Sequence, residues 1–173
     1  MLIFLFQNRV LAQTDQSANS VETTWEFATT TGTTLPSSSF QGVTENLPSV
    51  LFTIDRGFQY FRIESKYLFA SSEGVTIRRL HLLLKNYVEI FEVNYFWSLG
   101  VGMTQYKRNT NNYNDDGFNS SGGWQYAMGA KLKINKRLFF RAETGAYIRP
   151  GRSIYVGVGL GFILGGQSVE SNN

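Results

Sequence analysis

The sequence predicts an all-β fold, an eight-stranded antiparallel up-and-down β-barrel, and three observations support this prediction. Apolar residues alternate with polar or small residues along most of the chain, as in strands with two different faces. Aromatic residues make up 15% of the chain, with 17 glycines and only 3 prolines, which suits strands joined by tight turns. The lengths of the connections also vary in a regular way along the chain.

The alternation is clearest from Phe91 to Met103, where odd positions are apolar and most even positions are polar or small. Similar alternation marks each of the other predicted strands. The eight segments run near Val21–Thr31, Ser49–Asp55, Phe58–Ala70, Val75–Leu84, Glu89–Lys107, Gly123–Ile134, Leu138–Ile148 and Ser153–Leu164. The fourth segment also fits a helical stripe from Leu80 to Phe91. We favour a strand there because its neighbours are strands and because alternate leucines share one face.

Connection length depends on the parity of the preceding strand. Even strands are followed by short turns, predicted at Asp55–Gly57, Lys85–Tyr87 and Asn135–Arg137. Odd strands are followed by two long connections, Gly32–Pro48 and Arg108–Gly122, and by two short ones around Glu73 and Pro150. A transmembrane barrel shows this bias, with short turns on one side of the membrane and longer loops on the other.

Side-chain size predicts which face of the barrel points outward. Large aromatics such as Trp97 and Trp124 share the apolar face, whereas the other face carries charges and repeated glycines. Glycines and charges suit a narrow polar lumen, because an eight-stranded barrel has an interior just wide enough for side chains. We therefore expect the apolar face to contact lipid. The alternative is a soluble barrel whose aromatic face lines a cavity for an apolar ligand.

This orientation defines two sets of candidate residues. Charged side chains on the small-residue face are expected in the lumen, as an ion-pair filling or as a narrow ion path. These are Arg62, Glu64, Lys66, Arg79, His81, Glu92, Lys131, Lys133, Arg141 and Glu143. Aromatics near predicted strand ends are expected to form girdles at the two membrane interfaces. These are Tyr67, Phe69, Tyr106 and Trp124 on the external side, and Tyr87, Phe91, Phe140 and Phe162 on the periplasmic side.

Both ends of the chain are interpreted as lying outside the barrel, which we expect to span residues 21–164. Residues 1–12 look like a truncated signal peptide, with an apolar start and a small-residue cleavage site after Ala12. A disordered apolar terminus is the alternative. Residues 13–20 are expected to be a flexible polar segment, and residues 165–173 a polar C-terminal tail.

The chain resembles the small outer-membrane β-barrels of the OmpA/OmpX type. The resemblance covers Val21–Leu164 and consists of the strand number, the parity of loop length and a last strand, Ile154–Leu164, of alternating apolar residues and glycines. Such barrels often end on an aromatic residue, whereas Phe162 is followed here by the polar tail. The resemblance implies a bacterial outer-membrane location, with membrane lipid and lipopolysaccharide as surroundings.

The sequence contains only weak matches to motifs for catalysis or for metal, cofactor or nucleic-acid binding. The chain has no cysteine, its net charge is only +3, and its basic residues are scattered, which argues against thiolate metal sites and nucleic-acid binding. Asn112–Gly123 fails as a calcium loop because its last position lacks a glutamate. The glycines of Gly157–Gly161 follow strand spacing, so they do not form a dinucleotide fingerprint. His81 is the only histidine, and no nucleophile motif surrounds it. We expect neither a catalytic site nor a cofactor.

The predicted function is therefore a structural or surface-interaction role. Protein or ligand partners would bind the loops at residues 32–48 and 108–122, because loops supply specificity on a rigid scaffold. The alternatives are a narrow channel for ions or small solutes, a lipid-modifying barrel enzyme and the soluble lipid-carrying barrel.

Overall fold

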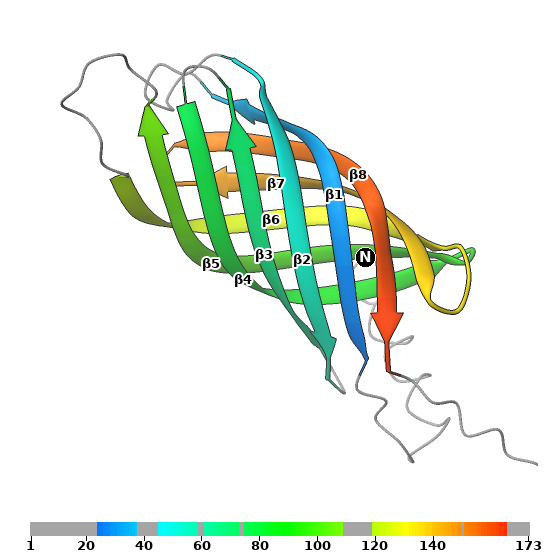
Figure 1. Cartoon of the computed structure of the whole chain (residues 1–173). Helices are drawn as coiled ribbons and strands as arrows, with labels where there is room; N and C mark the ends of the chain where they lie inside the picture. Colours follow the sequence, from blue (N-terminus) through cyan, green and yellow to red (C-terminus); the bar gives the residue numbers. More distant parts are fainter. Residues whose placement is uncertain are drawn as a thin grey trace, which may run out of the picture.

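The computed structural model describes residues 24–37, 45–58, 61–72, 75–108, 119–149 and 151–165. The predicted signal peptide, the polar segment at 13–20 and most of the C-terminal tail lie outside these residues. Eight strands follow one another along the chain (Figure 1). They are β1 (Trp25–Pro36), β2 (Leu47–Gly57), β3 (Arg62–Ser71), β4 (Val75–Ile90), β5 (Val93–Arg108), β6 (Asn119–Lys133), β7 (Leu138–Ile148) and β8 (Arg152–Leu164).

The strands form one closed antiparallel barrel in sequence order, with β8 paired to β1. This confirms the predicted fold class, and the fourth segment is a strand. The register is staggered around the barrel. A path that starts at Trp25 and follows directly paired residues returns to β1 at Leu35, ten residues further on. Such a shift accompanies strands tilted by about 35–45° to the barrel axis, and the strands in Figure 1 are visibly tilted.

The connections obey the predicted parity, but several of their positions differ. Asp55–Gly57 belongs to β2, and the following turn begins at Phe58. Lys85–Tyr87 is not a turn, because β4 continues to Ile90 and the chain reverses at Phe91–Glu92. The strands also extend into the predicted long loops, which leaves residues 37–46 and 109–118 as connections. The predicted turn at Asn135–Arg137 is confirmed.

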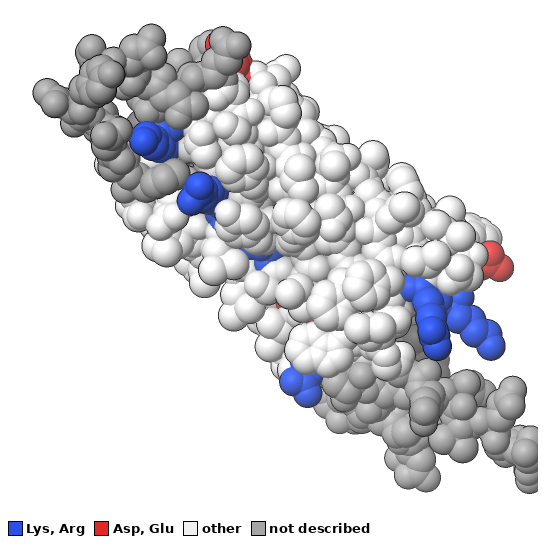
Figure 2. Space-filling model, in the orientation of Figure 1, with Lys and Arg blue, Asp and Glu red and all other residues white. Residues whose placement is uncertain are grey.

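Most side chains on the outer wall are apolar. On β5, Tyr95, Trp97, Leu99, Val101 and Met103 are each close to half exposed, while the residues between them point inward. Figure 2 shows that charged side chains on one face of the barrel gather mainly near its two ends, with a largely uncharged surface between them. An apolar belt around a closed barrel with a polar interior is the arrangement of a membrane-spanning barrel. The soluble-barrel alternative was wrong, because it requires the aromatic face to point inward.

Inward-facing glycines make room for large side chains in the lumen. A Cβ atom on Gly161 would lie 2.2 Å from the Phe139 ring, and one on Gly129 would lie 2.5 Å from the Phe96 ring. A Cβ on Gly102 would meet the His81 ring at 2.6 Å. These contacts explain why glycines alternate with apolar residues in these strands, since any larger residue would collide with an aromatic ring.

No helix among the residues that the structure describes is long and apolar enough to cross a membrane.

Candidate functional site: the filled lumen

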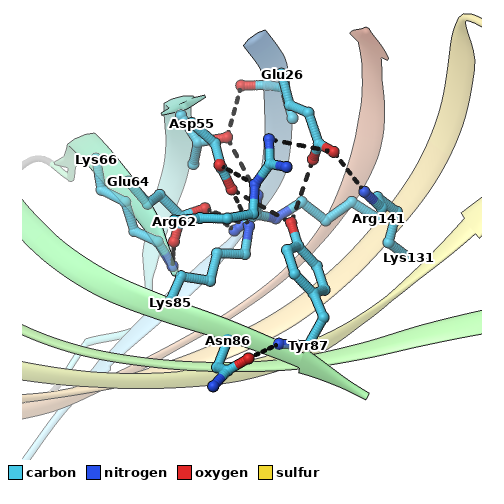
Figure 3. Close-up of polar contacts among 12 residues, drawn as sticks. Glu26, Asp55, Arg62, Glu64, Lys66, Lys85, Asn86, Tyr87, Lys131 and Arg141 are labelled. Carbon is cyan, nitrogen blue, oxygen red and sulfur yellow. Dashed lines mark hydrogen bonds and ion pairs between the residues drawn. The ribbon is translucent and has the colours of Figure 1, made fainter. Parts of the chain in front are cut away.

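The lumen next to the even-strand turns is filled by an ion-pair network around Glu64 on β3. Its side chains come from β1, β2, β3, β4, β6 and β7, and Figure 3 shows them pointing toward one another. The Glu64 carboxylate accepts hydrogen bonds from Arg141 Nη2 at 2.6 Å and from Lys85 Nζ at 2.9 Å, and it forms an ion pair with Lys66 at 3.3 Å. All four side chains are at most 2% exposed. One carboxylate therefore bridges cations from three other positions on the wall.

Arg141 on β7 connects this centre to a second carboxylate. Its guanidinium donates to Glu143 Oε2 through Nε at 2.6 Å, and it also donates to the Thr53 hydroxyl at 3.3 Å. Glu143 in turn accepts from Lys66 Nζ at 3.2 Å. The guanidinium carbon also lies 4.5 Å from the centre of the Phe96 ring. A buried charge is tolerated only when it is paired and hydrogen-bonded, and each of these charges is.

A second group of charges lies nearer the end of the lumen. Asp55 accepts from Lys85 Nζ at 2.7 Å and from Arg62 Nε at 2.5 Å, and Glu26 accepts from Lys131 Nζ at 2.7 Å. The Tyr87 hydroxyl lies 3.2 Å from Glu26 and 3.3 Å from Asp55. Lys85 thus joins this group to Glu64. The whole network crosses the barrel from wall to wall (Figure 3).

The lumen near the odd-strand loops is instead filled by an apolar cluster. Its members are at most 2% exposed and come from five strands, β2, β3, β4, β7 and β8. They are Leu47, Leu51, Leu68, Ala70, Val75, Ile77, Tyr147 and Tyr155, with Tyr106 packed against them. The tyrosines also make polar contacts: Tyr155 shares a 2.7 Å hydrogen bond with Thr30, and Tyr147 accepts from Gln125 at 3.2 Å. This end of the barrel is closed by side chains.

His81 and Arg79 lie between the ion-pair network and the apolar cluster. The Arg79 guanidinium stacks on Tyr147, 4.0 Å from the ring centre, and the His81 ring lies 5.4 Å from the same ring. Among the described residues, neither ring nitrogen of His81 has a hydrogen-bond partner, and the residue is 2% exposed. A catalytic histidine needs an orienting acid and a nucleophile within hydrogen-bond reach, and this imidazole contacts neither.

Most of the charges predicted for the lumen lie inside the barrel. Arg62, Glu64, Lys66, Arg79, Lys131, Arg141 and Glu143 face inward, as does His81. The structure corrects two positions. Glu92 is exposed in the turn between β4 and β5, because the alternation that defines β5 begins one residue later, at Val93. Lys133 has the inward parity of Lys131, but it is the last residue of β6 and its side chain is exposed.

The predicted interfacial aromatics divide in a similar way. Tyr67, Phe69, Trp124, Phe140 and Phe162 are on the outer wall, and Phe91 is 94% exposed in its turn. Tyr87 and Tyr106 were placed on the wrong face. Tyr87 points inward because β4 continues beyond Lys85 and so keeps the parity of that lysine. Tyr106 occupies an even position of β5, the parity that faces the lumen.

Sequence reasoning missed several lumen residues. Glu26, Asp55 and Lys85 complete the network, and Phe96 and Phe139 pack beneath its cations. The parity of each strand carries this information, because each of these residues lies two or four positions from another inward residue. The apolar cluster is harder to predict, because in β4 both faces are apolar around Leu82 and Leu83.

Comparisons with known proteins place this structure among outer-membrane barrels. No protein-family model matches the sequence, and no curated protein matches it. Neisserial surface protein A is similar in structure, with a TM-score of 0.65 at 10% identity, covering 81% of this chain and 96% of that one. The N-terminal barrel of Pseudomonas aeruginosa OprF gives 0.60 at 12% identity, covering 82% and 97%.

Ail, the attachment invasion locus protein of Yersinia pestis, is also similar. Its TM-score is 0.58 at 11% identity, covering 83% of this chain and 98% of Ail. Ail in complex with the heparin analogue sucrose octasulfate gives a TM-score of 0.55 at 11% identity, with the same coverage. Identities this low establish a shared fold only. The chain has the fold of the small eight-stranded outer-membrane β-barrels, with an apolar wall facing lipid and a lumen filled by side chains.

Proposed function

We propose that this protein is a bacterial outer-membrane barrel that acts through its surface, as a structural element of the envelope or as a platform for its external loops. The observation that carries the proposal is the packing of the lumen. Lys66, Lys85 and Arg141 are buried in one half, and Leu47, Leu51 and Leu68 are buried in the other, each at most 2% exposed. Such a lumen leaves the outer wall and the loops as the surfaces available to partners.

The proposed contact surface is the end of the barrel that carries the odd-strand connections. The two connections at residues 37–46 and 109–118 are its longest. Arg78, Arg149 and Arg152 are exposed near this end. Exposed guanidinium groups bind phosphate and sulfate well. We therefore propose that lipopolysaccharide phosphates contact this end. That Ail was crystallised with a heparin analogue agrees with anionic saccharides as a partner class.

Loop replacement tests the surface role. In one variant, short Gly-Ser turns replace residues 38–44 and 109–118, and in a matched control the β6–β7 turn Asn135–Arg137 is replaced. We expect the first variant to lose binding of intact cells to arrays of anionic saccharides while the control retains it. Both proteins should reach the outer membrane in equal amounts. Equal binding by both variants would contradict a role for the external loops.

A narrow channel is the second candidate, favoured only by the charged lumen. Planar-bilayer recording distinguishes the two functions. We expect the unaltered protein to be silent, because buried side chains fill both halves of the lumen. A variant with Leu51→Ser, Leu68→Ser and Tyr155→Ala should show small conductance steps. Conductance of the unaltered protein that changes in Glu143→Gln would instead support a channel.

We also propose that the barrel is not an enzyme and holds no cofactor, with residues 1–12 acting as part of an export signal. The imidazole of His81 supports the first statement, since within the described part of the chain its ring nitrogens bond to neither an acid nor a nucleophile. The measurement is mass spectrometry of lipid A from cells that overproduce the protein. Lipid A is expected to be unchanged. Modified lipid A that reverts to normal with His81→Ala would contradict the proposal.

A further inference from the structure

The outer wall carries a groove of about 190 Å³ at the end of the barrel where the even-strand turns lie. Trp25 on β1, Arg56 on β2 and Ile63 on β3 lie directly opposite one another on three adjacent strands. Ile54, Phe58 and Ser65 complete the lining. The groove is therefore built mainly from apolar side chains of the membrane-facing wall, with one guanidinium at the end of its strand.

Two aromatic rings hold the Arg56 guanidinium. Its central carbon lies 5.0 Å from the centre of the Trp25 ring and 5.3 Å from that of Phe58, distances typical of cation–π contacts. Within the described part of the chain Arg56 makes no ion pair, whereas lumen cations such as Arg62 and Lys85 are bound to carboxylates. The aromatic faces carry no formal charge. The N–H groups of the guanidinium are therefore available to an anion.

The position of the groove limits what can occupy it. Ile54 and Ile63 belong to the wall that faces hydrocarbon, while Arg56 lies at the end of β2, next to the turn that begins at Phe58. An occupant must therefore place an acyl chain against the isoleucines and an anionic group at Arg56. A soluble anion lacks the first part, and a soluble protein does not reach hydrocarbon depth. Short turns mark the periplasmic side of such barrels, so the lipid comes from the inner leaflet.

We propose that this groove is a binding site for an anionic glycerophospholipid of the inner leaflet. Its phosphate accepts hydrogen bonds from the Arg56 guanidinium, and its acyl chain packs along Ile54 and Ile63. Trp25 and Phe58 fix the guanidinium and flank the glycerol region. This site goes beyond the proposed surface role, which concerns the opposite end of the barrel. The two proposals are independent, so the failure of one does not affect the other.

Trp25 is a reporter within the site. We would place the W97F/W124F protein, which keeps Trp25 alone, in bilayers of phosphatidylcholine. Brominated phosphatidylglycerol or brominated phosphatidylcholine is then added, and tryptophan quenching is followed as the brominated fraction rises. We expect phosphatidylglycerol to quench Trp25 at a several-fold lower mole fraction. The W25F/W124F protein, which reports on the lipid belt around Trp97, should be quenched equally by both lipids.

Substitutions at Arg56 decide the assignment. Arg56→Gln should remove the preference, Arg56→Lys should retain most of it, and Arg152→Gln at the opposite end should leave it unchanged. Heat-modifiable gel mobility verifies that each variant is folded. The proposal is overturned if Trp25 shows no preference for phosphatidylglycerol, if Arg56→Gln keeps the preference, or if millimolar inorganic phosphate abolishes it and so reveals a site for free anions.

Discussion

At the scale of single residues, each buried carboxylate in the described lumen contacts at least one cation. Glu64 is the member with the most partners, since it contacts Lys66, Lys85 and Arg141. Three pairs of the network, Arg141–Glu64, Lys66–Glu143 and Lys131–Glu26, join strands that are far apart in the sequence. The network therefore stabilises the closed barrel only after all strands have assembled.

Removing one charge tests this arrangement. Glu64→Gln removes a carboxylate that three buried cations share. Loss of one partner of a buried ion pair costs about 3–5 kcal/mol. We expect the free energy of unfolding in phospholipid vesicles, measured by urea titration of tryptophan fluorescence, to fall by about that amount. Glu89→Gln is the control, because Glu89 is exposed near the β4–β5 turn and should change stability little. Equal effects of the two substitutions would contradict the network's role.

The pairing of glycine and aromatic rings gives a second prediction at this scale. Gly161→Ala would place a methyl group 2.2 Å from the Phe139 ring, and such overpacking typically costs about 1–3 kcal/mol. Phe139→Leu should recover part of the loss in the double variant. Gly122→Ala serves as the control, since its Cβ would meet only a backbone oxygen at 3.9 Å. The same urea titration measures all four proteins, and an additive double variant would exclude a direct contact.

Sequence reasoning succeeded at residue scale wherever parity was unambiguous. On β7, Arg141 and Glu143 alternate with residues of the outer wall, so their inward direction follows from period two alone. The direction of Tyr87 was predicted wrongly, because it depends on where β4 ends. The ion-pair partners could not be predicted from the sequence either. Glu64 and Arg141 are far apart in the sequence, and they meet only because barrel closure places β3 and β7 on opposite sides of a narrow lumen.

At the scale of elements, the β4–β5 hairpin is the least regular part of the barrel. The pairing of β4 with β3 stops at Lys85, but β4 itself continues to Ile90. The last residues of β4 therefore pair with β5 alone. The chain then reverses at two non-glycine residues with positive φ, 50° at Phe91 and 66° at Glu92. Two such residues form the reversed turn that suits a two-residue hairpin, but side chains there are strained. Sequence-based turn rules look for glycine or asparagine and so favoured Asn86 instead.

This turn predicts a stabilising change. Replacing Phe91–Glu92 by Asn-Gly should relieve the strain and raise the free energy of unfolding by about 1 kcal/mol, because that pair accepts positive φ at both positions. Refolding rate into vesicles and urea titration both measure the effect. Lys136→Gly is the matched control, since no positive φ occurs in the described β6–β7 turn and added glycine freedom should destabilise slightly. A destabilised Asn-Gly variant would contradict the assigned turn.

At the scale of the whole molecule, the sequence was enough to predict the barrel, but it was not enough to predict how side chains pack in the lumen. Strand number, parity of connection length and the outward aromatic face all follow from period-two patterning in segments such as β5. The stagger of ten residues does not, because it depends on register between β1 and β8, whose pairing residues are separated by nearly the whole chain. The apolar cluster around Leu51 and Tyr155 depends on that register as well.

The central claim is that odd positions of β5 face lipid and even positions face a packed lumen. The chain lacks cysteine, so single cysteines can be introduced cleanly at Trp97, Leu99, Val101 and Met103, and at Ser98 and Thr104. A bimane label and brominated lipid test each site in vesicles. The account predicts labelling and strong quenching at the four odd positions, and no labelling at Ser98 or Thr104 until the barrel is unfolded. Labelling and quenching with the opposite parity would contradict it.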